Sequence, residues 1–400
     1  MLEGIKRPFL ILLIVCLVLA AALGGVVISS TVMTMIGGLG ETATEPAAVH
    51  TSALTGVPTP DQLSPLPTAT VPPETATPTL SPTPQPEINE EPESTWRIAT
   101  LSGMGSDCTD LDFDPDGATL AIAGRDGVVR LIDAVTGVLQ HILEGHTLQV
   151  NQVAFAPDGS WLMSAADDGM LLRWDVSSGE QLAVLGDGTL GKLTALDISP
   201  GEDWIASGNA GGVVSLWNAN TGERSFRFDN SHLTRVSGLS FSPDGSQFAS
   251  ADLNGWIVIS PVDGNPGEVF ARDPDPVHDV VYTLDGRLVT ANMQGVWVWD
   301  VATGAGLVLE PAAAVGTVDR LAVSADGILL AALARSGAVW IWELAEHHLQ
   351  ATIPPDVTRA RSLAFSPTCD ACPEEPGWML AIGGENGRVW LWGIEQVPAE

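Results

Sequence analysis

The residues best suited to covalent or metal chemistry are two cysteines, Cys369 and Cys372, which form a Cys-x-x-Cys motif. A structural zinc ion takes four nitrogen or sulfur ligands, and no histidine adjoins these two thiols. A thioredoxin-like redox motif needs a surrounding βαβ pattern, which the neighbouring sequence lacks. We therefore expect no more than a local disulfide between Cys369 and Cys372 in an oxidising compartment, with Cys108 left free and buried.

A second group, Asp112-Phe-Asp114-Pro-Asp116-Gly117, resembles the start of a calcium-binding loop. The twelfth position of such a loop requires a bidentate glutamate, and here it is Ala123. The chain contains no nucleophile elbow, zinc-protease, Walker or dinucleotide-binding motif, and its histidines are not spaced as metal ligands. The sequence predicts a protein without enzyme activity, metal or cofactor.

The charge balance is strongly acidic. The chain has 17 Lys and Arg residues against 49 Asp and Glu residues, a formal net charge of -32. Binding to nucleic acid depends on clustered basic side chains, so this composition argues against a nucleic-acid partner. An acidic surface suits high solubility, a saline habitat or bound divalent cations, and the sequence does not distinguish among them.

The elements that must position any site come from a repeat. Its clearest copy, Val150 to Glu180, reads as three short strands joined by two tight turns, and a fourth strand follows at Gln181 to Leu185. The glycine of the second turn recurs every 40 to 50 residues, which is the period of a propeller blade. These glycines are Gly127, Gly169, Gly212, Gly255, Gly295, Gly337 and Gly387.

Tryptophan ends the third strand in five of the seven repeats, and Trp-Asp occurs at Trp174-Asp175 and Trp299-Asp300. With Pro-Asp-Gly turns such as the one at Pro157, this pattern resembles the WD-repeat β-propellers. The resemblance implies an all-β, seven-bladed propeller over residues 95–397. It also implies a hydrogen-bonded tetrad, complete only in the second repeat, so we expect apolar packing to hold most other blades. The tetrad residues are His146, Ser164, Asp168 and Trp174.

The segment before the repeats has two parts. Residues 1–40 include an apolar run at about 8–28 that is long enough to span a bilayer, and Lys6 and Arg7 precede it. The positive-inside rule then places everything after the span on the extracytoplasmic side. Ala20-Ala21-Ala22 offers an alternative, in which the segment is a cleaved signal peptide. Residues 41–94 are rich in Pro, Thr and Ser, which predicts a disordered linker.

The last repeat lacks a fourth strand, whereas Trp96 to Leu101 alternates as a strand should. We expect this N-terminal strand to complete the seventh blade and close the ring, which removes a free sheet edge.

Sorting the loops by face predicts a relatively basic face on this acidic protein. The turns between second and third strands, and the connections between blades, carry Arg125, Arg235, Arg335 and Arg359, and Trp256 adds an aromatic ring. Guanidinium groups bind carboxylates, so an acidic protein loop or an acidic polysaccharide is the expected partner. Alternatively, arginines of this face pair with Asp126, Asp168 or Asp319 of the chain itself.

The leading functional interpretation is a single-pass, membrane-anchored extracytoplasmic propeller that acts as a protein-binding or scaffolding module. The alternative is an extracytoplasmic enzyme or redox protein that uses the propeller channel or the Cys369 and Cys372 pair. The sequence indicates neither the identity of the partner nor the oligomeric state.

Overall fold

The computed structural model describes residues 95–102, 105–186, 188–229, 231–310, 315–355, 359–367 and 377–395. The predicted anchor at 1–40, the predicted linker at 41–94, and the Cys369 and Cys372 pair lie outside these residues. Within the described ranges, no helix is long and apolar enough to cross a membrane.

In this part of the chain, 28 strands form seven antiparallel sheets of four strands each. Blade 1 comprises β2 (Cys108–Phe113), β3 (Thr119–Gly124), β4 (Val128–Asp133) and β5 (Leu139–Glu144). Blade 2 comprises β6 (Val150–Phe155), β7 (Trp161–Ala166), β8 (Leu171–Asp175) and β9 (Gln181–Leu185). Blade 3 comprises β10 (Leu193–Ile198), β11 (Trp204–Asn209), β12 (Val214–Asn218) and β13 (Arg224–Phe228).

The remaining blades follow the same plan. Blade 4 comprises β14 (Val236–Phe241), β15 (Gln247–Asp252), β16 (Trp256–Pro261) and β17 (Glu268–Arg272). Blade 5 comprises β18 (Asp279–Tyr282), β19 (Leu288–Asn292), β20 (Gly295–Trp299) and β21 (Gly306–Val308). Blade 6 comprises β22 (Val318–Val323), β23 (Leu329–Ala334), β24 (Val339–Glu343) and β25 (His348–Ile353). Blade 7 comprises β26 (Ser362–Phe365), β27 (Gly377–Gly383), β28 (Val389–Glu395) and β1 (Thr95–Leu101), with a short 3₁₀ turn, η1 (Glu385–Gly387), between β27 and β28.

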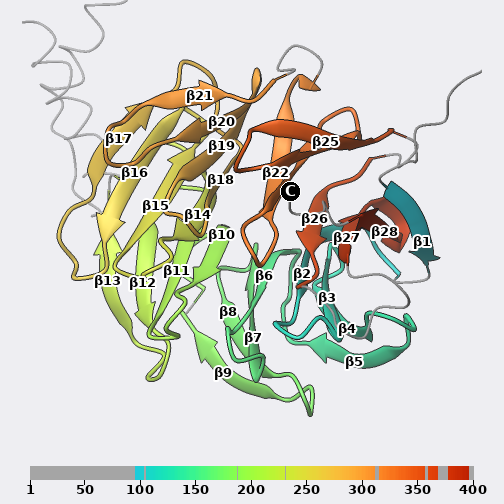
Figure 1. Cartoon of the computed structure of the whole chain (residues 1–400). Helices are drawn as coiled ribbons and strands as arrows, with labels where there is room; N and C mark the ends of the chain where they lie inside the picture. The colour runs from blue at the N-terminus through green and yellow to red at the C-terminus, as the bar shows by residue number, and fades with distance from the viewer. Residues whose placement is uncertain are drawn as a thin grey trace, which may run out of the picture. The chain divides into compact units, whose positions relative to one another are not determined.

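The blades follow one another around a ring, and the chain colour passes through them in order (Figure 1). The first strand of each blade contacts the first strand of the next, and β26 contacts β2 to complete the circle. Closure depends on β1, which pairs antiparallel with β28 from Thr95 opposite Ile394 to Leu101 opposite Val389. The N-terminal strand therefore completes blade 7, as the unfilled strand position predicted.

Apolar side chains fill the spaces between neighbouring sheets. One cluster joins Leu131 and Val129 of blade 1 to Phe155, Leu172 and Trp174 of blade 2, and every other junction has a similar cluster. Because second strands such as β3, β7 and β23 are buried on both faces, they lack the polar alternation of a surface strand. A single blade would expose these faces, so repetition is needed for stability.

The recurring turn glycine packs against the loop that leads from its own blade to the next blade. Gly169 has φ +78° and Gly255 has φ +82°, values that glycine adopts more readily than other residues. A side chain at Gly169 would meet the carbonyl oxygens of Gly188 and Gly191, and one at Gly255 would collide with that of Asp273. The loop between blades therefore packs directly on the turn, which holds both at one end of the ring.

Polar networks support more blades than the sequence predicted. In blade 2, His146 Nε2 lies 2.8 Å from Ser164 Oγ, His146 Nδ1 lies 3.0 Å from Asp168 Oδ2, and Trp174 Nε1 donates to Ser164 Oγ at 2.9 Å. Burial lowers the pKa of His146, so its imidazole is neutral near pH 7.

Apolar packing fills the other junctions as expected, and hydrogen-bonded turns add to it in several blades, where the turn-capping group lies two residues earlier in the chain. Asp252 of blade 4 lies at the end of the second strand, where blade 2 has Ala166, and its Oδ1 accepts from Asn254 N and Trp256 N at 2.9 Å. His232 of the same blade lies 2.7 Å from Ser250 Oγ through Nε2. Equivalent capping oxygens come from two asparagines, Asn209 of blade 3 and Asn292 of blade 5.

Candidate functional site

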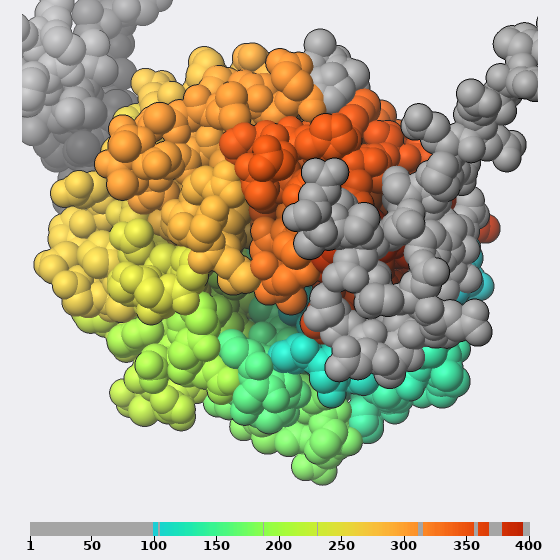
Figure 2. Space-filling model, in the orientation of Figure 1, coloured from blue at the N-terminus to red at the C-terminus, as the bar shows by residue number. Residues whose placement is uncertain are grey.

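A cavity of about 670 Å³ lies at the centre of the ring, and side chains from six of the seven blades line it. The blades surround a central hollow in the space-filling view (Figure 2). We refer to the space lined by these residues as the central cavity. They are Thr109, Gln149, Asn151, Arg235, Ser237, Leu253, His278, Asp319, Arg320, Arg335, Arg359, Ala360, Arg361 and Glu385.

The lining follows from the repeat. One residue per blade comes from the start of the first strand or the residue just before it, and others come from the connections between blades and from the turns between second and third strands. Because ring closure brings all first strands to the axis, positions about 40 residues apart in the chain meet at one opening. The first-strand series is Thr109, Asn151, Ser237, His278, Asp319 and Arg361.

Several of these first-strand side chains also join adjacent blades. Thr109 Oγ1 donates to Val150 O at 2.6 Å, and Asn151 Nδ2 donates to Leu193 O at 2.6 Å. Ser237 Oγ donates to the Val277 carbonyl in the same way, at 2.6 Å. These bonds fix the wall of the central cavity before any ligand arrives, which lowers the entropic cost of binding.

The cavity is positively charged, although the chain as a whole is acidic. Its lining contains five arginines and two acidic residues, a formal charge of 5 − 2 = +3, against -32 for the whole chain. The arginines are Arg235, Arg320, Arg335, Arg359 and Arg361, and the acids are Asp319 and Glu385.

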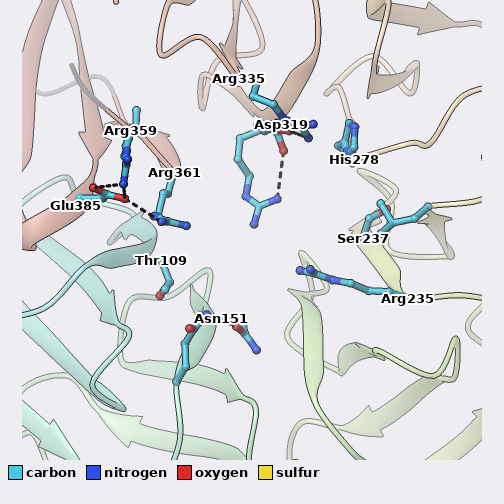
Figure 3. A pocket seen from close by; sticks show the side chains of 14 residues that line it. Thr109, Asn151, Arg235, Ser237, His278, Asp319, Arg335, Arg359, Arg361 and Glu385 are labelled. Atoms are coloured by element: carbon cyan, nitrogen blue, oxygen red, sulfur yellow. Dashed lines mark hydrogen bonds and ion pairs between the residues drawn. The ribbon is translucent and has the colours of Figure 1, made fainter. Parts of the chain in front are cut away.

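Three of the five arginines have counter-ions within the chain. Arg335 Nη2 lies 2.6 Å from Asp319 Oδ1. Glu385 Oε1 lies 3.0 Å from Arg359 Nη1 and 3.2 Å from Arg361 Nη2 (Figure 3). Of the acids expected as partners, Asp319 pairs with Arg335, whereas Arg359 and Arg361 pair with Glu385 instead.

The other two arginines, Arg235 and Arg320, form no ion pair with any acid of the described residues. Arg235 comes from the connection between blades 3 and 4, and its side chain extends toward the middle of the cavity (Figure 3). Arg320 lies in β22 and makes one hydrogen bond, from Nη1 to the Asp319 carbonyl at 3.2 Å. Burial lowers the pKa of Arg235, and the positive charge of Arg320 lowers it further.

Carboxyl groups line the inner strands beyond this opening. Asp110 Oδ2 accepts from Val153 N at 3.1 Å, Asp112 Oδ2 from Phe155 N at 2.7 Å, and Asp279 Oδ2 from Leu321 N at 3.0 Å, so each joins its blade to the next. Asp197 does the same for blades 3 and 4. Loss of hydration raises the pKa of Asp110 to about 7, of Asp112 to about 8 and of Asp197 to about 7, although Asp110 and Asp112 keep partial exposure.

The structure brings together three of the five residues predicted for the binding face. Arg235, Arg335 and Arg359 all line the central cavity, whereas Arg125 and Trp256 do not. Arg125 instead lies 3.2 Å from Asp107, through Nη1 and Oδ2.

Trp256 does not line the central cavity, so its expected aromatic contribution to a binding face stays a prediction. Trp256 pairs in register with Arg272 of the outer strand β17, and the Arg272 guanidinium lies 5.1 Å from the centre of the indole ring. Leu253 of the same turn lines the cavity instead. Sequence reasoning also missed His278, whose only signal was its place in the first-strand series.

Cys108 does not line this cavity. Cys108 is a free, buried thiol, and burial raises its pKa to about 12, so it is unreactive near neutral pH. Cys369 and Cys372 lie outside the described residues, and their disulfide stays a prediction. Among the residues that the structure describes, no cluster of three His, Cys, Asp or Glu side chains is arranged to hold a metal ion.

Comparison with known families bears out the WD repeats. The family described as "WD domain, G-beta repeat" matches residues 96–133, 137–175, 179–218 and 223–259. Each match begins in or near the outer strand of one blade and extends into the third strand of the next, which is the overlap that closes the ring through β1. The chain therefore carries WD40 repeats, folded as a seven-bladed β-propeller.

Curated relatives share only segments with this chain. Meiotic recombination protein rec14 of Schizosaccharomyces pombe is 36% identical over 89 residues, which are 22% of this chain and 30% of that protein. Nuclear distribution protein PAC1-2 of Uncinocarpus reesii is 37% identical over 100 residues, 22% of each chain. WD repeat-containing protein SL1-17 of Schistosoma mansoni is 41% identical over 69 residues, 17% of this chain and 23% of that protein. The matches thus cover less than a third of each relative.

Proposed function

We propose that this propeller is a protein-binding module that captures an anionic segment of a partner at the central cavity, while an N-terminal anchor holds it on the extracytoplasmic side of a membrane. WD-repeat propellers are generally protein-interaction or scaffold modules, which supports the first part. The observation that carries the proposal is the charge of the cavity, +3 by its lining on a chain of -32.

This charge distribution favours one mode of binding. The negative potential of most of the surface repels an acidic partner, and the arginine-lined opening attracts it. Such complementarity acts chiefly on the association rate and on the orientation of docking. The cavity would therefore select which part of an acidic partner approaches, and its binding would weaken as salt concentration rises.

Support for the anchor comes from the sequence. The apolar run at about 8–28 is of bilayer-spanning length, and Lys6 and Arg7 are the basic residues that flank it on the N-terminal side. No further basic residue occurs before Arg97, so the charge difference favours an extracytoplasmic propeller.

A lysine near the cavity allows a direct test. Lys192 is the only lysine of the repeat region. It lies 2.6 Å from Asp167, which also accepts from the cavity residue Asn151, and 61% of its side chain is exposed. A membrane-impermeant, amine-reactive cross-linker added to intact spheroplasts should therefore react at Lys192 and join the chain to its partner. High salt during the reaction should reduce this product.

The matched control moves the lysine to the other end of the ring. In a Lys192→Arg, Ser246→Lys variant, the reactive amine lies in an exposed turn between β14 and β15, away from the cavity. We expect labelling of this variant without partner capture. If Lys192 is unreactive until the membrane is permeabilised, the extracytoplasmic assignment is wrong. If only the relocated lysine captures the partner, binding occurs at the opposite end.

A further inference from the structure

Two of the five arginines that line the cavity form no ion pair within the described residues, and this distinguishes them from the other three. Asp319 neutralises Arg335, and Glu385 neutralises Arg359 and Arg361. Arg235 makes no hydrogen bond or ion pair within the described residues, and Arg320 makes only its bond to the Asp319 carbonyl.

These two guanidinium groups repel each other. Loss of hydration inside the cavity and the positive charge of Arg320 both lower the pKa of Arg235, although the residue as a whole stays exposed to solvent. Holding like charges together without an anion costs free energy. An anion placed between them would attract both groups and offset this repulsion, which is already present in the free protein.

Unsatisfied hydrogen-bonding groups surround the same place. Arg320 Nε and His278 Nε2 are buried atoms without a hydrogen-bond partner in the described chain. Leaving such a group unpaired costs roughly 1–3 kcal/mol, more for a charged one. The Arg320 Nε–H is a donor, so its missing partner is an acceptor such as a carboxylate oxygen, whereas His278 Nε2 donates or accepts according to the tautomer of the ring.

The acids near the opening limit the charge of the ligand. The carboxyl groups of Asp110 and Asp279 lie close enough to Arg320 to interact with its charge, and Asp319 borders the cavity. At pH 8, above the raised pKa of Asp110 of about 7, the negative charges of Asp110 and Asp319 oppose a dianion more strongly than a monoanion. A planar monoanion matches both this limit and the fork of a guanidinium group.

We propose that the centre of the cavity is a carboxylate-binding site, in which Arg235 and Arg320 together hold a glutamate or aspartate side chain, or a C-terminal carboxylate, of the partner. This inference rests on the proposed function for the source of the ligand. The geometry of the two arginines defines the site itself, and the paired arginines at the edge guide the approach without binding the inserted group.

The probe for this site is a fluorescently labelled hexaglutamate peptide, titrated against the full-length chain in detergent and followed by fluorescence anisotropy. Charge-assisted hydrogen bonds contribute about 1.5–3 kcal/mol each. We therefore expect Arg235→Gln and Arg320→Gln each to weaken peptide binding by about tenfold or more. The matched changes Arg335→Gln and Arg359→Gln remove the same charge from paired positions and should weaken it less than threefold.

Competition distinguishes the kinds of anion. Acetate should displace the peptide at lower concentration than inorganic phosphate at pH 8, where phosphate is mostly a dianion. Displacement at lower phosphate concentration would overturn the assignment to a carboxylate. Wild-type binding by Arg235→Gln would overturn the site, and because Arg235 is exposed, this variant is expected to fold normally. Arg320→Lys keeps the positive charge and loses the planar guanidinium group, so it checks that the Arg320→Gln result reflects binding. Melting curves check that the Arg320 variants fold.

The two proposals fail in different ways. If Lys192 captures a partner and the arginine variants bind hexaglutamate normally, the proposed function stands and the carboxylate site is wrong. If the peptide binds at Arg235 and Arg320 while Lys192 captures no partner, the site stands and its ligand is not a protein partner.

Discussion

At the end of the ring opposite the central cavity, aspartates lie in tight turns and accept hydrogen bonds from the backbone of the same turn. Asp158 Oδ1 accepts from Ser160 N at 2.8 Å, and Asp175 Oδ1 accepts from Ser178 N at 2.8 Å. These bonds lower the pKa of both acids. We call these residues the turn acids, and the group also includes Asp116, Asp133, Asp244, Asp300 and Asp326.

At the cavity end and along the inner strands, charged side chains differ from the turn acids in their pKa values and partners. Enclosure raises the pKa of Asp110 and Asp112, and Arg235 has no counter-ion in the described chain. Turn acids are satisfied by bonds within a few residues, so they serve the turn. Asp110 and Asp112 also accept backbone hydrogen bonds, but Arg235 and Arg320 form no ion pair within the described residues, and such groups are candidates for binding.

The largest expected effect tests the ring that separates these two ends. Deleting residues 95–101 removes β1, exposes the edge of β28 and opens blade 7. We expect aggregation, or a melting temperature lower by about 10 °C or more, since each kcal/mol lost shifts Tm by about 2–4 °C in a domain of this size.

The control deletion removes the same length of chain from the linker, residues 80–86, and should leave Tm unchanged. Light scattering and thermal melting measure both outcomes. Equal melting temperatures for the two deletions would show that β1 is not needed to hold the ring closed.

A smaller expected effect is on the pH dependence of stability, which should differ between variants of an inner-strand acid and of a turn acid. An unfolded aspartate has a pKa near 3.9, whereas that of Asp112 is about 8 in the folded protein. Between these values the folded state binds more protons, so this group stabilises the fold at low pH and that stability is lost as pH rises toward 8. The loss is at most about 1.4 kcal/mol per pH unit for each retained proton.

We therefore expect Asp112→Asn, which keeps an acceptor for Phe155 N, to flatten the decline in unfolding free energy between pH 5 and pH 9. The variant should be more stable than wild type at pH 9. Asp175→Asn is the matched turn-acid control, and its lowered pKa predicts no change in this window. Urea unfolding at several pH values measures both, and an unchanged slope for Asp112→Asn would contradict the raised pKa.

The smallest expected effect concerns the turn acids alone. Asp158→Ala removes the acceptor for Ser160 N and should cost about 0.5–1.5 kcal/mol of stability, whereas Asp158→Asn keeps an acceptor and should cost less. Neither change should alter hexaglutamate binding, because the turn is at the other end of the ring. A loss of peptide affinity as large as that of Arg235→Gln would remove the distinction between the two ends.

Much of the fold could be predicted from sequence because each blade is specified locally. Turn residues such as Pro157 and Gly169, and strand alternation, define the hairpins within about 30 residues. The unfilled position in the last blade likewise predicted β1. Local rules failed for the turn cap, because two positions in the repeat can supply its oxygen. In blade 4, Asp252 at the end of the second strand caps the turn in place of a residue two positions later.

The sequence by itself determined the repeat, the blade boundaries, the tetrad of blade 2 and the end of the ring at which the arginines lie, because these depend on residues close together in the chain. Only the tertiary structure decided which arginines are paired. The pairing of β22 with β23 sets Asp319 beside Arg335, and the fold of blade 7 sets Glu385 beside Arg359, whereas Arg235 and Arg320 form no ion pair within the described residues. The physical reason is that Coulomb energy depends on distances of a few ångströms between side chains, and the spacing of residues along the chain does not give these distances.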